Sequence, residues 1–126
     1  MFNIIGLDHI VLNTSKTNEL IHFYCNILGC TIERKQPDLQ LTQLRAGDSL
    51  IDIIEDKSYT RQDCNNLEHF CLKIHPFRYE DCEAYFSKHD IQLYRYGERF
   101  GAQGKVYSFY LHDPDGNKIE LCELKK

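Results

Sequence analysis

The chain contains 126 residues, which is the length of one compact domain. Hydrophobic residues make up 42% of it and charged residues 27%, so a largely disordered chain is excluded. Acidic residues outnumber basic ones by 19 to 15, and the net charge of −4 argues against a nucleic-acid surface. No apolar run is long enough to span a bilayer and Met1-Phe2-Asn3 opens no signal peptide, so we predict a cytoplasmic protein without a membrane partner.

The first half of the chain predicts one strand, one amphipathic helix and three more strands. Residues 7–13 are rich in β-branched and apolar side chains, which favours a strand. A helical stripe follows, and Gly29 stands where a left-handed residue ends a helix. The stripe consists of Leu20, Phe23, Tyr24, Ile27 and Leu28, and the later strands are predicted over 30–35, 39–45 and 50–54, with a turn at Pro37-Asp38.

The second half predicts the same order of elements after a polar linker over residues 57–66. A strand over 67–74 precedes a second helical stripe, whose members are Tyr79, Cys82, Tyr85, Phe86 and His89. A glycine-rich loop is expected over 97–104, and Asp113-Pro114-Asp115-Gly116 indicates a turn. The remaining strands are predicted over 91–96, 106–111 and 118–124.

Six cysteines occur, and none has the C-x-x-C spacing of a zinc–thiolate or thioredoxin-type site. An even number allows three disulfides. However, four of the six lie in apolar periodic segments, where they resemble small core residues: Cys25, Cys71, Cys82 and Cys122. Together with the expected cytoplasmic location, this predicts that these four, Cys30 and Cys64 are reduced thiols.

The two halves also resemble each other in sequence. Leu7-Asp8-His9-Ile10-Val11-Leu12 aligns with Leu67-Glu68-His69-Phe70-Cys71-Leu72, and Ile51-Asp52-Ile53 aligns with Ile119-Glu120-Leu121. Each half therefore has the order β-α-β-β-β, with a histidine on its first strand and a carboxylate on its last. We expect a single domain over residues 1–126, built from a module over 1–56 and a module over 67–126.

The alternation of side chains along a strand places each of these polar residues opposite an apolar face. The apolar face is expected to cover the helix of its own half, and the polar face to line a cup. Imidazole nitrogens and carboxylate oxygens suit one divalent ion such as Zn, Ni, Fe, Co or Mn. A lone His9 is more often a hydrogen-bonded core residue, but its match with His69 and Glu120 favours metal ligation. Asp52 is either a further ligand or a carboxylate at the rim of the cup.

Three segments resemble the vicinal oxygen chelate superfamily, which includes glyoxalases, bleomycin-binding proteins and extradiol dioxygenases. They are Leu7-Asp8-His9-Ile10-Val11-Leu12, Phe23-Tyr24-Cys25-Asn26-Ile27-Leu28-Gly29 and Asp113-Pro114-Asp115-Gly116-Asn117-Lys118-Ile119-Glu120-Leu121. The resemblance implies an α+β fold in which two βαβββ modules form a cupped mixed sheet. It also implies a homodimer, because family members often complete the metal site through pairing.

Carried over to this chain, the family's metal ligands fall on His9, His69 and Glu120, and the fourth glyoxalase position falls on Asp52. The family usually has glutamate at that fourth position, and aspartate is one methylene shorter. Without Asp52, the set resembles the two-histidine-one-carboxylate arrangement of the dioxygenase and fosfomycin-transferase branches.

The leading hypothesis is therefore a metal-dependent enzyme of glyoxalase type, with lyase or isomerase chemistry on a small oxygen-chelating substrate. Glu120 and Asp52 are its candidate catalytic carboxylates. The alternatives are a metal-dependent transferase or dioxygenase of the same superfamily, a non-catalytic small-molecule binding or resistance protein, and a structural interaction module.

Residues 96–105 supply the candidates for substrate binding. The segment predicts either a lid over the site or an ordinary hairpin connection. Arg99, Lys105 and Arg45 are candidates for an anionic substrate group, against the alternative of solvated surface charges. Tyr107 is a further candidate, and the alternation allows either Tyr107 and Phe109 or Ser108 and Tyr110 to face the cup. The other histidines, His22, His75, His89 and His112, are interpreted as surface or structural residues.

Overall fold

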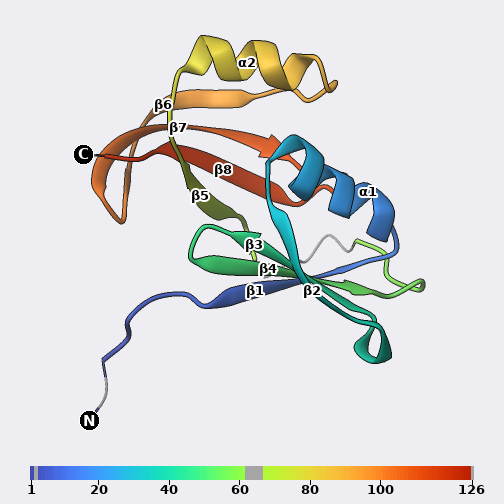
Figure 1. Cartoon of the computed structure of the whole chain (residues 1–126). Coiled ribbons are helices and arrows are strands. Elements are labelled where there is room, and N and C mark those ends of the chain that lie inside the picture. The colour runs from blue at the N-terminus through green and yellow to red at the C-terminus, as the bar shows by residue number, and fades with distance from the viewer. Residues whose placement is uncertain (2, 62–66, 126) are drawn as a thin grey trace. The chain divides into compact units, whose positions relative to one another are not determined.

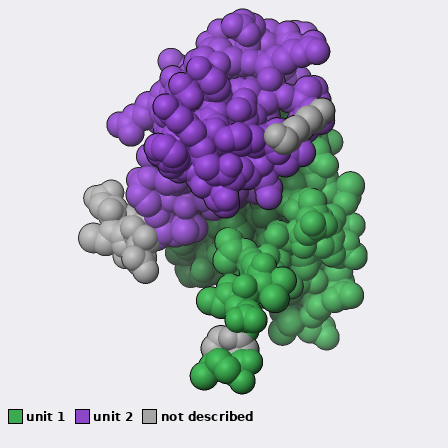
Figure 2. Space-filling view, turned by 90° about the vertical axis from the view of Figure 1, so that its left-hand side faces the viewer, with its two compact units in different colours: residues 1–61 green, residues 62–126 purple. Residues whose placement is uncertain are grey.

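The computed structural model describes residues 1, 3–61 and 67–125, which form two compact units, 1–61 and 62–126 (Figure 2). Each unit contains one four-stranded mixed sheet and one helical segment between its first two strands (Figure 1). The predicted α+β class with two βαβββ modules is confirmed. No helix within the described residues is long and apolar enough to cross a bilayer.

Unit 1 has the strand order β1-β4-β3-β2, in which β1 runs parallel to β4 and the other neighbours are antiparallel. The predicted helix is present as α1, which continues directly into the π-helical segment η1. The elements are β1 (His9–Thr14), α1 (Thr17–Ile21), η1 (His22–Ile27), β2 (Thr31–Gln36), η2 (Pro37–Leu39), β3 (Leu41–Ala46) and β4 (Ser49–Glu55).

The core of unit 1 follows from the two hydrophobic periodicities. The helical stripe buries Leu20, Phe23 and Tyr24, and α1 contacts β4. The alternate positions Leu44, Ile51 and Ile53 of the sheet are also buried. Gly29 has φ +89° directly after the helical segment, a conformation that a residue with a Cβ adopts only at a cost.

Unit 2 repeats this arrangement with the strand order β5-β8-β7-β6, and β5 runs parallel to β8. Its core is aromatic: Phe109 on β7 contacts Phe77, Tyr79 and Phe86 from α2 and the residues before it. The elements are β5 (Phe70–Ile74), α2 (Tyr79–Ser87), β6 (Tyr94–Gly101), β7 (Gly104–His112) and β8 (Lys118–Glu123).

The turn at Asp113 is confirmed. Its buried carboxylate accepts hydrogen bonds from the backbone amides of Asp115 and Asn117, both at 2.9 Å, and from the Asn117 side chain at 2.7 Å. Gly116 takes φ +81° within this turn. An aspartate that bonds the backbone two residues ahead is the physical basis of such turns.

Three expectations are wrong. The glycine-rich loop expected over 97–104 is mostly strand, because β6 extends to Gly101 and β7 starts at Gly104; of the two alternatives for residues 96–105, a lid or a hairpin connection, the structure has the hairpin. The strand expected over 91–96 begins only at Tyr94. Cys71, expected in the core, is exposed.

The expected linker over 57–66 lies partly outside the described residues, as does Cys64. The other five cysteines are free thiols. Of the linker, residues 57–61 are described, and the Tyr59 amide donates to the Asp56 carbonyl at 2.9 Å in a turn after β4. That the two units form a single domain stays a prediction.

We expect Leu44→Ala to lower the free energy of unfolding by about 2–5 kcal/mol, because it leaves a cavity in a fully buried part of the sheet. Leu39 is 60% exposed in the turn before the same strand, so Leu39→Ala is the matched control, with a change below about 0.5 kcal/mol. Urea unfolding followed by circular dichroism measures both. Equal effects of the two variants would contradict this core.

Candidate functional site

In unit 1, His9 and Asp52 lie on one face of the sheet. The parallel pairing of β1 with β4 sets Val11 opposite Asp52, and His9 stands two positions before Val11. Both therefore point away from the apolar face that contains Ile51 and Ile53. The side chain of His9 is 44% exposed, whereas Asp52 as a residue is only 5% exposed.

The residue before His9 holds its ring. The Nδ1 atom of His9 lies 2.8 Å from Oδ2 of Asp8. This hydrogen bond raises the pKa of the His9 imidazole above its usual value, and the nearby Asp52 carboxylate acts in the same direction. The sequence contains Asp8 in the repeated motif, but its contact with the ring could not be read from spacing alone.

Asp52 has a partner that sequence reasoning missed. Both of its carboxylate oxygens lie 3.2 Å from Nε2 of Gln43, which donates to them from the neighbouring strand β3. The register of β3 and β4 sets Gln43 directly opposite Asp52. Alternation predicted a strand over these residues but not which residue of β4 each one faces.

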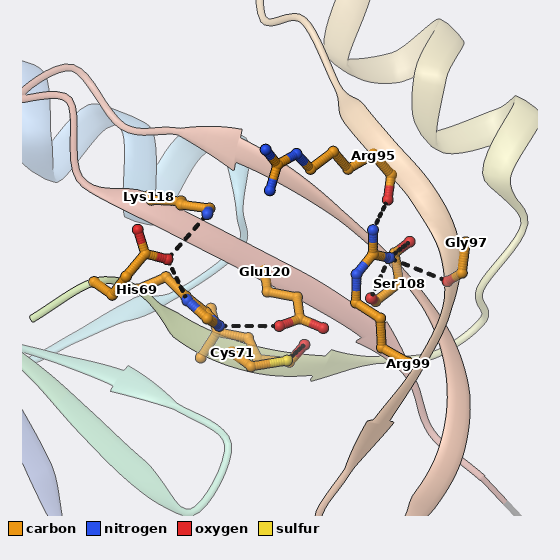
Figure 3. A network of polar contacts seen from close by, with 10 residues as sticks. His69, Cys71, Arg95, Gly97, Arg99, Ser108, Lys118 and Glu120 are labelled. Atoms are coloured by element: carbon orange, nitrogen blue, oxygen red, sulfur yellow. Dashed lines mark hydrogen bonds and ion pairs between the residues drawn. The ribbon is translucent and has the colours of Figure 1, made fainter.

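In unit 2, His69 and Glu120 contact each other directly (Figure 3). Nε2 of His69 lies 3.2 Å from Oε1 of Glu120, which β8 presents beside Cys71 of β5. The other ring nitrogen, Nδ1, lies 2.9 Å from Oε1 of Glu68. Lys118 also donates to Glu68 at 2.9 Å, and this cation, followed by His69, lowers the pKa of the Glu68 carboxyl.

The two units thus hold their histidines in the same way. In each, the carboxylate of the preceding residue lies within hydrogen-bonding distance of Nδ1. In unit 1 this leaves Nε2 of His9 as the ring nitrogen for a ligand, whereas Nε2 of His69 already lies 3.2 Å from Oε1 of Glu120. Proteins use this carboxylate–imidazole contact to orient histidines that ligate metals. Asp8 and Glu68 are therefore candidates for orienting the two histidines. The sequence could have indicated this role, because an acidic residue directly precedes the histidine in both halves.

The four predicted ligands divide between the units, with His9 and Asp52 in one and His69 and Glu120 in the other. Among the residues that the structure describes, no group of three or more histidine, cysteine or acidic side chains forms a metal centre. Each unit by itself brings one imidazole and one carboxylate to the same face of its sheet.

The candidate substrate residues of β6 and β7 separate onto two faces. The pairing of β6, β7 and β8 places Arg99, Ser108 and Tyr110 on the face of Glu120. Lys105 and Tyr107 lie on the opposite face, that of Phe109 and α2, where Tyr107 stacks on Tyr96. The pair that faces Glu120 is therefore Ser108 and Tyr110.

Tyr110 is the centre of the polar face of unit 2. Its ring contacts His69 edge-on at 5.4 Å between centroids, and both Lys118 and Arg99 lie over it, at 4.6 and 4.9 Å. Burial and the Glu120 carboxylate raise the pKa of its hydroxyl, so Tyr110 is neutral at physiological pH. The sequence left its orientation open.

Two of the described thiols, Cys30 and Cys71, have a strongly raised pKa. Burial, with the neighbouring Cys25, raises the pKa of Cys30 to about 11. Cys71 is an exposed residue on the face of Glu120, but loss of hydration around its sulfur and the nearby Cys122 raise its pKa as well. Because of this raised pKa, Cys30 and Cys71 stay protonated near neutral pH, and the reactive form of cysteine is the thiolate.

The protein thus consists of two βαβββ modules, each with an imidazole and a carboxylate on the polar face of its sheet. A family model, described as the Glyoxalase/Bleomycin resistance protein/Dioxygenase superfamily, matches residues 6–71, just over half of the chain. The chain belongs to this superfamily. No curated protein matches the sequence.

Solved structures share the fold. An integron cassette protein from the mobile metagenome of V. cholerae is 24% identical, with 99% of each chain covered and a TM-score of 0.78. A virulence protein from Salmonella typhimurium is 24% identical, with 98% of this chain and 100% of that chain covered and a TM-score of 0.76. A lactoylglutathione lyase from Agrobacterium tumefaciens is 21% identical, with 95% and 94% covered and a TM-score of 0.69.

We expect Asp8→Asn to lower the pKa of His9 toward the usual 6.5 of histidine, because the charged partner of its Nδ1–H is removed. The raised pKa of His9 favours the folded state at low pH, and this stabilisation is lost as the pH rises through the folded pKa. Proton NMR titration of the imidazole measures the shift. Asp48→Asn, in the turn after β3, is the control; an unchanged His9 titration in Asp8→Asn would refute the contact.

Proposed function

We propose that the protein is a divalent-metal-dependent enzyme of glyoxalase type that acts on a small, oxygen-chelating substrate by lyase or isomerase chemistry. His9, His69, Glu120 and Asp52 would hold one ion. The observation that carries this proposal is the duplicated arrangement in which each unit presents an imidazole and a carboxylate on one face. Membership of the superfamily supports it, because its members typically bind a metal ion.

The donor chemistry fits a borderline divalent ion. Two imidazoles whose Nδ1 atoms lie against Asp8 and Glu68 would offer Nε2 as the ligand atom, and at His69 the ion would replace the contact of Nε2 with Glu120. With carboxylate oxygens, this donor set suits Zn, Ni, Fe, Co or Mn better than Mg or Ca.

When bound, the ion would act as a Lewis acid toward the oxygens of the substrate. The protein's own part would be to take up and return a proton, and Glu120 and Asp52 are the carboxylates proposed for this role. Tyr110 would supply a neutral hydroxyl beside Glu120. Of the three candidate substrate-binding residues, Arg99 lies on the face of Glu120 and is the one proposed for this site, whereas Lys105 and Tyr107 lie on the opposite face.

The contact between Gln43 and Asp52 favours a second candidate. Both oxygens of Asp52 already accept hydrogen bonds at 3.2 Å, and its side chain is shorter than the glutamate usual at this position. If Asp52 stays with Gln43, the remaining ligands are His9, His69 and Glu120. That two-histidine-one-carboxylate set would suit a metal-dependent transferase or dioxygenase of the same superfamily.

The proposal includes a small-molecule substrate and the pairing of two copies of the chain, since superfamily members often form dimers and bind small molecules. The cytoplasmic location also stays a prediction.

We expect His9→Ala, His69→Ala and Glu120→Gln each to weaken metal affinity by about tenfold or more, because each removes a ligand atom. Metal analysis after purification without chelator, followed by calorimetric titration of zinc into the stripped protein, measures this. His22→Ala, an exposed histidine on η1, is the control and should bind normally. Protein without stoichiometric metal, together with unchanged zinc affinity in His9→Ala, would refute the proposal.

We expect Asp52→Asn to weaken zinc affinity about tenfold as well, because the glyoxalase-type site uses a fourth ligand. Asp48→Asn serves as the matched control in the same titration. Wild-type affinity in Asp52→Asn would exclude the four-ligand site and select the transferase or dioxygenase alternative, in which Asp52 only holds Gln43.

A further inference from the structure

Three cationic side chains are candidates for an anionic group of the substrate, and the structure separates them. Nε of Arg45 pairs with Glu33 at 3.1 Å, and Nζ of Lys105 lies 3.8 Å from Glu98. Arg99 pairs with no carboxylate among the described residues, although it is half-buried. A partly buried cation without a counter-ion is costly unless something else compensates its charge.

Neutral acceptors hold one side of the Arg99 guanidinium (Figure 3). Nη1 donates to the carbonyls of Gly97 and Ser108, each at 3.2 Å, and lies 3.1 Å from Ser108 Oγ. Nη2 donates to the carbonyl of Arg95. These contacts orient the planar group without neutralising it.

The backbone that provides these acceptors is irregular. The pairing of β6 with β7 shifts register between Tyr94 and Gly97, and Arg95 has φ +55°. A residue other than glycine adopts this left-handed conformation at an energetic cost, and such strain concentrates at functional sites. The register shift lies in the segment whose carbonyls, at Arg95 and Gly97, accept hydrogen bonds from Arg99. The irregular backbone of β6 therefore provides the acceptors that orient the guanidinium.

The donors that remain form a fork. A guanidinium has five N–H groups, of which Nη1 contributes two and Nη2 two. The contacts above use both hydrogens of Nη1 and one of Nη2, which leaves Nε–H and the second hydrogen of Nη2 without an acceptor among the described residues. Two neighbouring N–H groups of arginine match the spacing of two oxygens in a carboxylate or phosphate.

Arg99 also lies where a substrate of the proposed site would need it. Its guanidinium is 4.9 Å from the ring centre of Tyr110, and Tyr110 pairs directly with Glu120 across β7 and β8. Of the nearby charged groups, Lys118 already pairs with Glu68, and Glu120 lies against His69. Arg99 is therefore the cation of this face that an incoming anion would neutralise.

We propose that Arg99 anchors an oxyanion-binding subsite, so that the substrate carries a carboxylate, phosphate or phosphonate group in addition to its chelating oxygens. The identification of this anion as part of the substrate rests on the proposed function. The subsite itself rests on the carbonyl-held guanidinium, its open fork and its place beside Tyr110 and Glu120.

The test uses the full-length, metal-free protein. Inorganic phosphate and acetate are titrated separately while the Nε–Hε signals of the arginines are followed by nitrogen-15 NMR. We expect the Arg99 signal to shift saturably with at least one anion, and Arg34 on β2 to remain unchanged. Shifts with phosphate alone, acetate alone or both support the subsite and identify the preferred anion. No shift at Arg99, or equal shifts at Arg99 and Arg34, would overturn it.

Variants give a second measurement. Arg99→Gln and Arg99→Lys should each weaken anion affinity by about tenfold or more, the lysine because it keeps the charge but loses the fork. Arg34→Gln should leave affinity within about twofold of wild type. Wild-type affinity in Arg99→Gln would overturn the subsite; should that variant not fold, the wild-type titration still decides. Since no metal is present, anion binding and the metal site can fail independently.

Discussion

The parallel pairing of the first and last strands within each unit is the constraint on which the rest of the structure depends. Residues that are paired in a sheet point to the same side, so β1 and β4 must present His9 and Asp52 together once Val11 faces Asp52. The pairing of β5 with β8 does the same for His69 and Glu120. A helix is the usual connection that covers one face of such a unit, which leaves the opposite face for polar chemistry.

Although the two units share this plan, they stabilise their polar faces differently. In unit 2 the polar groups form a continuous network in which Lys118, Glu68, His69 and Glu120 contact one another in turn. In the described part of unit 1, His9 contacts Asp8, and Asp52 accepts hydrogen bonds from Gln43 instead. A buried carboxylate is stable only when it accepts hydrogen bonds. Gln43 donates them to Asp52 without neutralising the negative charge. Because of this difference, the availability of Asp52 as a ligand depends on Gln43.

Much of the fold was predictable because its signals are local. The helical stripe around Phe23, the end of that helix at Gly29 and the Asp113 turn each depend on side chains a few residues apart. The repeat of acid and histidine at Asp8-His9 and Glu68-His69 was equally visible. The extent of β6 was missed because the glycines and charges over 97–104 suggest a loop, whereas the pairing of Glu98 with Tyr107 and of Phe100 with Lys105 continues the strand to Gly101.

The sequence by itself determined the two βαβββ modules and the residue types on each strand, since alternation and helical periodicity follow from the geometry of the chain. Only the tertiary structure decided which partner each polar residue meets. Gln43 contacts Asp52, Arg45 contacts Glu33, and Arg99 contacts carbonyls among the described residues. These contacts follow from the strand register and from the irregular strands β2 and β6. A shift of register by one residue reverses the face of every side chain, so these contacts depend on the pairing of distant segments that no local pattern encodes.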